Sequence, residues 1–344
     1  MDIELIDKNF FVPDKIERDG IEYINALDLT VNGVMAEDGR FTRMPTAVAK
    51  SVSPAVENLN FSLAGGRVRF ITDSPYIAVC VYLNTVGKMG HFPFTGSVGM
   101  DLYSGKRYYG TFIPPFSVES SYSAVIDLDG KMREYTINLP LYSGIDQLYI
   151  GYKGGCVMEK AKPYKIEKPV IFYGSSITQG GCASHAGSAY ENIISRELDC
   201  DIINFGFSGN AKGETTMAEY IASLDMSAFV LDYDHNADFP QDLQQTHERF
   251  FQIVRKAHPT VPIIMLTRPQ PYLNKDEKLR KKIVKTTYLN ALNSGDNNVY
   301  FIPGDKFFPD IVKNMALVDN CHPNDCGFYF MAKAVLRTLK KVLG

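Results

Sequence analysis

From residue 169 onward, short apolar runs alternate with longer stretches of helical periodicity, and this alternation restricts the fold more than any other feature. The apolar runs read VIFYG, DIINFGF, AFVLDYD, VPIIMLTRP and NVYFIPG, and polar, helix-forming stretches separate or follow them. A strand–helix repeat of this kind builds a parallel sheet that is covered by helices on both faces. We therefore expect residues 169–344 to form an α/β domain.

The first half of the chain has a different rhythm. From about residue 59 to residue 153, β-branched and aromatic runs such as YIAVCVYLN follow one another closely, separated by Gly, Pro, Asn and Asp. Many short strands with frequent turn residues indicate an antiparallel, jelly-roll-like β-sandwich. We expect residues 1–160 to form this accessory domain, with the less regular first 58 residues wrapped around it. The polar segment KAKPYKIEKP would link it to the α/β domain.

The composition argues against several classes of function. The 344 residues are 45 % hydrophobic and 22 % charged, with a net charge of −3, which is typical of a globular protein. The partial basic cluster KLRKKIVK is spaced like the solvated face of a helix, so we expect no nucleic-acid partner. No apolar stretch reaches the roughly 18 residues of a membrane span, so we also expect no membrane partner.

The cysteines and the N-terminus give expectations about compartment and metal. The six cysteines are scattered without a Cys-x-x-Cys pair, which favours a reducing compartment over a disulfide framework. Cys321 and Cys326 flank His322, but a second close pair of ligands is missing, and we expect neither a metal nor another cofactor. The start MDIELIDKNFF does not resemble a signal peptide. As the sequence stands we expect a cytoplasmic protein, or a secreted or periplasmic one if a signal peptide was trimmed. The oligomeric state stays open.

Four segments at the expected strand ends carry groups suited to acyl transfer. GSSIT, GFSGN and DHNAD follow the first three apolar runs, and DNCHP precedes the last helix. A serine alcohol needs a base, and the imidazole base needs a carboxylate, so we interpret Ser176, His322 and Asp319 as a candidate triad. The candidate oxyanion donors are the N–H groups of Ser176 and Gly209 and the amide of Asn236.

Each of these residues alone has an ordinary structural interpretation. Ser176 could cap a helix or line a phosphate-binding turn, Gly209 could occupy a left-handed turn, and Asn236 could cap a helix. Their order and their shared place at strand ends favour the catalytic interpretation. The pattern differs from the Gly-x-Ser-x-Gly elbow of α/β-hydrolases, because Thr178 stands at the second glycine position.

The four segments resemble the sequence blocks of the SGNH (GDSL-type) hydrolases over about residues 169–344. The resemblance implies a flavodoxin-like parallel sheet with helices on both faces. The residues that match the family's catalytic and oxyanion positions are Ser176, Gly209, Asn236, Asp319 and His322. Two departures are Ser175 in place of the usual Asp and His-Asn-Ala-Asp in the third block. Ser175 occupies a mainly structural position, whereas the changed third block could alter the shape of the substrate pocket.

The first half also resembles part of this family. GMDLY is similar to the GxDLY motif of a β-domain that precedes one subgroup of SGNH hydrolases, and FTRMP and VRFITDSP resemble it too. The two-domain plan is similar to that of carbohydrate O-acetylesterases. It implies a serine esterase for short acyl esters, above all acetyl esters on carbohydrate hydroxyls, with a small molecule or an oligosaccharide as the substrate. A lipid or thioester acylhydrolase and a catalytically inactive carbohydrate-binding protein remain alternatives.

Several other polar residues are candidates for the substrate pocket. His235 adjoins Asn236, Arg268 ends the fourth apolar run, and His91 lies in a β-domain loop that could reach over the site. The pocket candidates are His91, His185, His235 and Arg268. We expect Asp101, in the GxDLY-like motif, to be buried and structural. We expect His247, in the middle of a charged helix, to be exposed.

Overall fold

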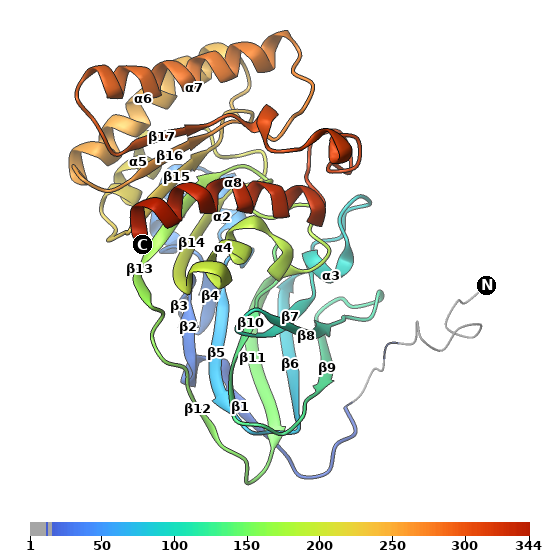
Figure 1. Ribbon diagram of the computed structural model, residues 1–344. Coiled ribbons are helices and arrows are strands. Elements are labelled where there is room, and N and C mark those ends of the chain that lie inside the picture. Colours follow the sequence, from blue (N-terminus) through green and yellow to red (C-terminus); the bar gives the residue numbers. More distant parts are fainter. Residues whose placement is uncertain (1–11, 13–15) are drawn as a thin grey trace.

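The computed structural model describes residue 12 and residues 16–344, and these form two stacked regions (Figure 1). The lower region in this view holds the antiparallel sheets of the first half of the chain. The upper region holds a parallel sheet between helices. The expected fold class, an α/β domain preceded by an antiparallel β-domain, is confirmed.

Two antiparallel sheets make up the β-domain. The first has the order β1-β11-β6-β9, with strands β1 (Ile21–Asn25), β11 (Gly144–Lys153), β6 (Tyr76–Thr85) and β9 (Ser121–Asp127). The second has the order β12-β5-β10-β7-β8 with β2 beside β5, and its strands are β12 (Met158–Lys160), β5 (Arg67–Thr72), β10 (Arg133–Asn138), β7 (Met100–Ser104), β8 (Arg107–Phe112) and β2 (Thr30–Asn32). Alternate residues of each strand point inward, so that Val79 of β6 and Ile137 of β10 share one buried cluster.

Short elements surround the sandwich. They are η3 (Ala26–Asp28), the hairpin of β3 (Met35–Glu37) and β4 (Arg40–Thr42), α1 (Thr46–Val52), α2 (Pro54–Leu59) and α3 (Phe94–Ser97). The expectation that the first 58 residues wrap the sandwich is wrong for α1 and α2. Ala49 and Val56 lie in the apolar cluster of the parallel sheet, together with Met217 and Phe205. The short apolar faces of these helices cover part of the α/β domain because that sheet offers apolar surface beyond its own helices.

The α/β domain contains a five-stranded parallel sheet with the order β14-β13-β15-β16-β17. Its strands are β13 (Ile166–Gly174), β14 (Cys200–Gly206), β15 (Ala228–Asp232), β16 (Ile263–Leu266) and β17 (Val299–Ile302). The first strand in sequence, β13, lies next to the edge strand β14, which follows it in sequence. The strands β15, β16 and β17 are then added in order on the other side of β13. This is the flavodoxin-like order, and its switch point lies between β13 and β15, where Ser176 emerges.

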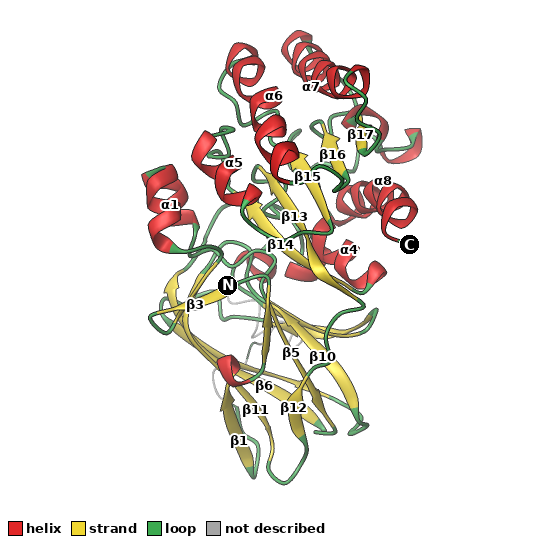
Figure 2. Ribbon diagram, turned by 90° about the vertical axis from the view of Figure 1, so that its left-hand side faces the viewer, coloured by secondary structure: helices red, strands yellow, loops and turns green. Residues whose placement is uncertain are grey.

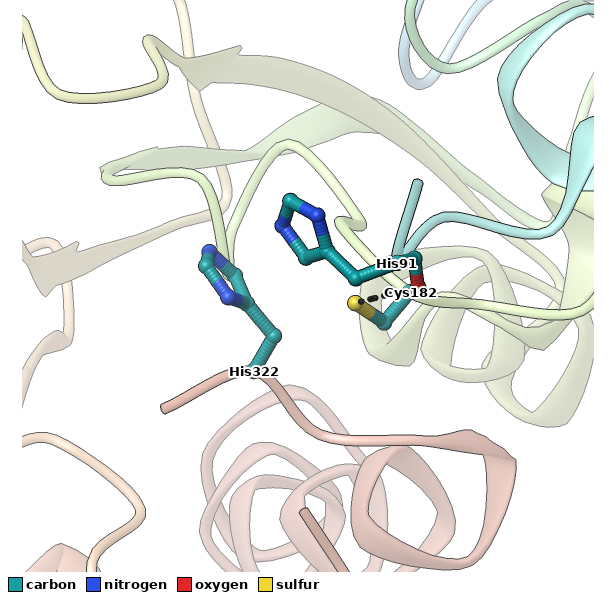
Figure 3. A group of neighbouring side chains, drawn as sticks. All are labelled: His91, Cys182 and His322. Atoms are coloured by element: carbon teal, nitrogen blue, oxygen red, sulfur yellow. Dashed lines mark hydrogen bonds between the residues drawn. The ribbon is translucent and has the colours of Figure 1, made fainter. Parts of the chain in front are cut away.

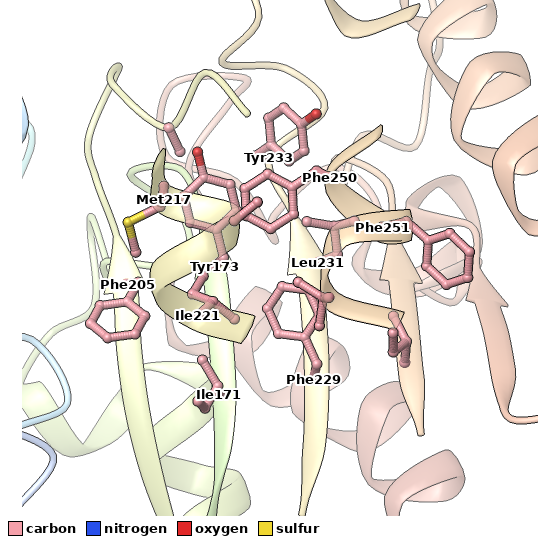
Figure 4. Packing of buried hydrophobic residues seen from close by; sticks show 14 of the residues in the cluster. Ile171, Tyr173, Phe205, Met217, Ile221, Phe229, Leu231, Tyr233, Phe250 and Phe251 are labelled. Atoms are coloured by element: carbon pink, nitrogen blue, oxygen red, sulfur yellow. The ribbon is translucent and has the colours of Figure 1, made fainter. Parts of the chain in front are cut away.

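Helices cover both faces of this sheet, as Figure 2 shows. They are α4 (Tyr190–Leu198), α5 (Thr215–Ala222), α6 (Pro240–Ala257), α7 (Lys275–Asn293) and α8 (Asp325–Leu343), with short turns η4 (Ala186–Ser188), η5 (Gly304–Lys306) and η6 (Asp310–Val312). One face is packed by α4 and α8 and the other by α5, α6 and α7. On the second face Tyr173 stacks on Phe250 with ring centroids 4.6 Å apart (Figure 4).

The helix α6 contradicts one expectation. His247 is only 1 % exposed, because α6 and α7 pack together and place Thr287 against its ring. The Nδ1 atom lies 2.9 Å from Thr287 Oγ1, and burial lowers the pKa of His247 to about 4. The charged neighbours in the sequence were misleading, since a helix can bury one polar residue among several that face solvent. None of the helices in the described part of the chain has the length and apolar character needed to cross a membrane.

Buried arginines of the β-domain bind the backbone of β14. Arg43, from the FTRMP segment, donates to the carbonyl oxygens of Gly206 at 2.5 Å and Asn204 at 3.4 Å. Its guanidinium lies 4.4 Å from the ring centroid of Phe207, and burial lowers the pKa of Arg43 to about 9. Arg67 donates to Ile202 O at 3.1 Å and forms an ion pair with Asp201. Arg43 of the FTRMP segment and Arg67, which directly precedes VRFITDSP, therefore bind the strand that leads to Gly209.

Candidate active site

The turn after β13 presents Ser176. A Cβ atom on Gly174 would collide with Thr178 Oγ1 and with the carbonyl oxygen of Asp232, so the strand must end in glycine to turn this sharply. Ser175 is fully buried, and its Oγ accepts a hydrogen bond of 3.1 Å from Ile177 N, which is a structural role. Ser176 is 7 % exposed.

The structure brings Ser176 into contact with the pair of Asp319 and His322, which is distant from it in sequence. Ser176 Oγ lies 2.7 Å from His322 Nε2, and His322 Nδ1 lies 2.8 Å from Asp319 Oδ2. The local turn fixes the second pair, because Asp319 Oδ1 also accepts a 2.7 Å hydrogen bond from the backbone N–H of His322. Leu317 and Pro323 form a β-bridge across the base of this turn.

The charges around His322 favour its protonated form. Burial alone lowers the pKa of His322, but the neighbouring Cys321 and Asp319 outweigh burial and raise it above its ordinary value. Burial raises the pKa of Asp319, but the hydrogen bonds from His322 outweigh this effect and lower it. Cys321 responds in the same way: burial raises its pKa, whereas His235 and His322 lower it to about 6. The site therefore stabilises an imidazolium, the charge that a general base acquires.

The candidate oxyanion donors lie in the turns after three neighbouring strands. Gly209 has φ +69, a left-handed conformation suited to glycine. Among the backbone hydrogen bonds of the described residues, the N–H groups of Ser176 and Gly209 have no acceptor. Asn236 Nδ2 donates to Phe207 O at 3.0 Å, which uses one of its two amide hydrogens and leaves the other available.

The β-domain reaches the site through the loop after β6. His91 Nε2 lies 3.8 Å from Asp319 Oδ2, and the rings of His91 and His322 are 5.6 Å apart (Figure 3). The ring of Phe92 is also 5.6 Å from that of His322, and Tyr142 donates to Ser176 O at 3.1 Å. The loop that carries His91 thus reaches the triad, and the part of His91 in a substrate pocket stays a prediction. Phe92 and Tyr142 had no sequence signal, because only the packing of the domains brings them here.

His185 has a different role from the one expected. Its Nδ1 atom is 2.5 Å from Asp101 Oδ2, and its Nε2 atom is 3.0 Å from Ser188 Oγ. Asp101 is fully buried and also accepts hydrogen bonds from Gly187 N at 2.5 Å and Asn138 Nδ2 at 2.6 Å. Both ring nitrogens of His185 are thus used by the protein, and the residue joins the two domains instead of lining a substrate pocket. Asp101 is structural, as expected.

Arg268 holds the turn that carries the triad's acid and base. Its Nη1 atom donates to Glu277 Oε1 at 2.8 Å, and its Nη2 atom donates to Asn320 O at 2.9 Å. Arg268 is therefore committed to protein groups near the site. His235 is nearly buried, with Nδ1 3.7 Å from Asp234 Oδ1 and its side chain 12 % exposed. It adjoins Asn236, and its contact with a substrate stays a prediction.

Two groups of side chains near the triad have donor atoms close enough to hold a metal ion. His91, Cys182 and His322 form the first, and Asp319, Cys321 and His322 form the second, with the ligand atoms of each group within 4.8 Å of one another. Cys326, the cysteine singled out with Cys321 by sequence, belongs to neither group found among the described residues. All six cysteines are free thiols.

Comparison with known proteins identifies the class to which this fold and site belong. Residues 167–340 match the GDSL-like lipase/acylhydrolase family, and residues 21–157 match the N-terminal domain of SGNH hydrolase-type esterases. The chain belongs to the GDSL-like lipase/acylhydrolase family, and it is a carboxylic ester hydrolase. No curated protein matches the chain.

Solved structures share both domains. A protein from Bacteroides ovatus described as a GDSL-like lipase is 29 % identical, with a TM-score of 0.84 over 94 % of this chain and 98 % of that one. A salicylyl-acyltransferase of a tetracycline biosynthetic pathway is 20 % identical, with a TM-score of 0.76 over 94 % and 98 %. An acetyl xylan esterase from the rumen bacterium Butyrivibrio proteoclasticus is 14 % identical, with a TM-score of 0.61 over 94 % and 99 %. The last two show a shared fold.

Proposed function

We propose that this protein is a serine esterase that removes short acyl groups, above all acetyl, from carbohydrate hydroxyls. The observation that carries the catalytic part is the chain of contacts from Ser176 Oγ to His322 Nε2 at 2.7 Å and from His322 Nδ1 to Asp319 Oδ2 at 2.8 Å. A nucleophile, a base and an orienting carboxylate in hydrogen-bond contact are what acyl transfer through a serine requires.

The reaction proceeds through an acyl-enzyme. Ser176 Oγ attacks the ester carbonyl while His322 Nε2 takes its proton, and Asp319 stabilises the imidazolium. The N–H groups of Ser176 and Gly209 and the amide of Asn236 donate to the oxyanion of the tetrahedral intermediate. His322 then gives its proton to the departing alcohol. A water molecule, deprotonated by His322, cleaves the acyl-enzyme and releases the acid.

Two considerations support a short acyl group on a sugar. The nucleophile is only 7 % exposed, and Phe92 and Tyr142 of the β-domain lie around it, which favours a small acyl group over a long chain. The two-domain plan recurs in the acetyl xylan esterase of Butyrivibrio proteoclasticus, which supports the carbohydrate part of the proposal by analogy of fold.

The proposal is tested by acid release from acetylated oligosaccharides and from p-nitrophenyl esters of increasing chain length, for the wild type and for Ser176→Ala. We expect release of acetate from the sugars, a falling rate with longer p-nitrophenyl esters, and a loss of about 10⁶-fold in kcat for Ser176→Ala. Ser175→Ala serves as the matched control and should retain most of the activity. Equal rates for the wild type and Ser176→Ala would exclude Ser176 as the nucleophile.

A preference for long acyl chains would instead assign the enzyme to the lipid branch of the family. Binding of the sugars without any hydrolysis, by the wild type and by Ser176→Ala alike, would support the carbohydrate-binding alternative.

A further inference from the structure

Of the donor group formed by His91, Cys182 and His322, only His322 takes part in the reaction described above. The three residues come from separate segments: the β-domain loop after β6, the loop after the nucleophile turn, and the turn before α8. Their ligand atoms all lie within 4.8 Å of one another, and Figure 3 shows the two imidazole rings beside the thiol. We propose that these residues form a binding site for a borderline divalent transition metal, Zn²⁺ above all, whose occupation inhibits the esterase.

The donor set selects the kind of metal. Two imidazole nitrogens and one thiolate are typical zinc ligands, whereas Mg²⁺ and Ca²⁺ prefer oxygen. The thiol of Cys182 loses its proton to solvent when it coordinates. In a tetrahedral zinc site, N–N and N–S pairs lie about 3.3–3.6 Å apart, given bonds of about 2.0–2.3 Å. The ligand atoms now lie within 4.8 Å of one another, so the side chains must move closer together to reach this geometry.

The surroundings of the three side chains allow a metal ion to enter and leave one of its coordination positions open to solvent. The side chain of His91 is 43 % exposed and that of His322 is 14 % exposed, so solvent reaches the group from the His91 side. Cys182 lies deeper, at 3 % exposure, and its Sγ donates a weak hydrogen bond to His91 O at 3.4 Å. Three protein ligands with one side open to solvent leave the fourth position to water.

Inhibition follows from the role proposed for His322, and this part of the inference rests on the proposed function. Nε2 of His322 contacts Ser176 Oγ, and Nδ1 contacts Asp319. Coordination through Nε2 removes the acceptor for the serine proton, and coordination through Nδ1 removes the orienting carboxylate. Binding would also link the β-domain to the α/β domain across the site, because His91 belongs to the first and His322 to the second.

The first test is inhibition of p-nitrophenyl acetate hydrolysis by ZnCl₂, with each variant compared with its own metal-free rate. We expect inhibition of the wild type that EDTA reverses, and at least a roughly tenfold higher half-inhibitory concentration for Cys182→Ser. Cys182→Ser should keep its metal-free rate, because Cys182 contacts none of the reacting atoms. His91→Asn, a change at a half-exposed side chain, should also raise the half-inhibitory concentration.

The matched control is Cys321→Ser, which alters the second donor group. At a pH well above the pKa of His322 in both proteins, where a proton does not compete with the metal, we expect it to be as sensitive to ZnCl₂ as the wild type. If Cys321→Ser relieves inhibition and Cys182→Ser does not, the metal binds Asp319, Cys321 and His322, and the proposal is wrong. Unchanged sensitivity in both variants also overturns it.

The second test does not depend on turnover and separates failure of the metal site from failure of the proposed function. CoCl₂ is titrated into Ser176→Ala and into the double variant Ser176→Ala/Cys182→Ser. We expect a thiolate-to-cobalt absorption band in the first protein and its loss in the second, with unchanged far-ultraviolet circular dichroism. Absence of the band from Ser176→Ala overturns the site even if the esterase proposal holds.

Discussion

The contact between the domains and the site around Ser176 both place polar groups below the surface, but they differ in how these groups are satisfied. At the domain contact, the Asp101 carboxylate accepts hydrogen bonds from Asn138, Gly187 and His185. At the site, the N–H groups of Ser176 and Gly209 have no acceptor among the described residues. Saturated polar groups hold a structure together, whereas unpaired donors beside a nucleophile are available to a ligand.

The two places are nevertheless coupled through the loop that follows the nucleophile. Thr95 Oγ1 donates to Ser184 O at 2.5 Å, next to His185 and its contact with Asp101. On the other side, Ser184 N donates to Asp325 Oδ1 at 2.8 Å, at the start of the helix that follows His322. The β-domain therefore helps to position the loops of the site. Four predictions distinguish residues that stabilise the contact between the domains from residues that take part in catalysis.

The largest effect is expected from Asp319→Asn. The amide cannot stabilise the imidazolium and can reverse the hydrogen bond to Nδ1, so kcat should fall by about 10²–10⁴-fold. The lower part of this range is favoured because the side chain of Asp319 is 33 % exposed and water can replace it in part. The measurement is steady-state kinetics with p-nitrophenyl acetate. An unchanged kcat with normal folding would remove Asp319 from the mechanism.

Asp101→Ala should act on stability first. It removes a fully buried carboxylate and leaves the donors of Asn138, Gly187 and His185 without their acceptor, at a cost of about 3–5 kcal/mol in the free energy of unfolding. Urea unfolding measures this change. The control is Asp127→Ala, a carboxylate that is 74 % exposed, for which we expect about 0.5 kcal/mol or less. Equal effects at both positions would contradict the anchoring role.

Asn236→Ala should reduce kcat by about 10²–10³-fold, because one oxyanion donor is lost. KM should change much less, since the donor acts mainly on the charge that develops in the transition state. Kinetics and thermal unfolding are measured side by side. A large drop in stability with kcat preserved in the folded protein would show that the hydrogen bond to Phe207 O is the residue's whole contribution.

The smallest effect concerns pH. His322 must be neutral to accept the serine proton, so kcat/KM should fall about tenfold per pH unit as pH drops below the pKa of His322. Because Cys321 and Asp319 raise this pKa, the acid limb should lie above the ordinary histidine range of about 6.5. Cys321→Ser removes a negative charge and should move the limb to lower pH. An acid limb that does not move would show that Cys321 has no influence on the base.

The sequence predicted the fold class, and it predicted a candidate triad in two loops, the turn that holds Ser176 and the turn that holds Asp319 and His322. The alternation of apolar runs with helical stretches is typical of a parallel sheet covered by helices. In such a sheet the carboxyl ends of the strands bring together loops that are distant in sequence. The flavodoxin-like strand order came from the resemblance to SGNH hydrolases. Prediction was weaker for side chains whose role depends on whether the fold buries them. His247 was expected at the surface and is buried, and His185 was expected in the pocket and binds Asp101.

What the sequence determined by itself is local: the strand that ends at Gly174, the hydroxyl that follows it, and the tight turn that joins Asp319 to His322. These features depend on backbone geometry over a few residues, so the types of residue and their spacing are enough to predict them. What only the tertiary structure decided is the approach of the two domains. It places His91, Phe92 and Tyr142 at the nucleophile and brings Cys182 beside two imidazoles. These contacts depend on how the surfaces of the two domains pack against each other. The spacing of residues along the chain does not give the distances between residues of different domains.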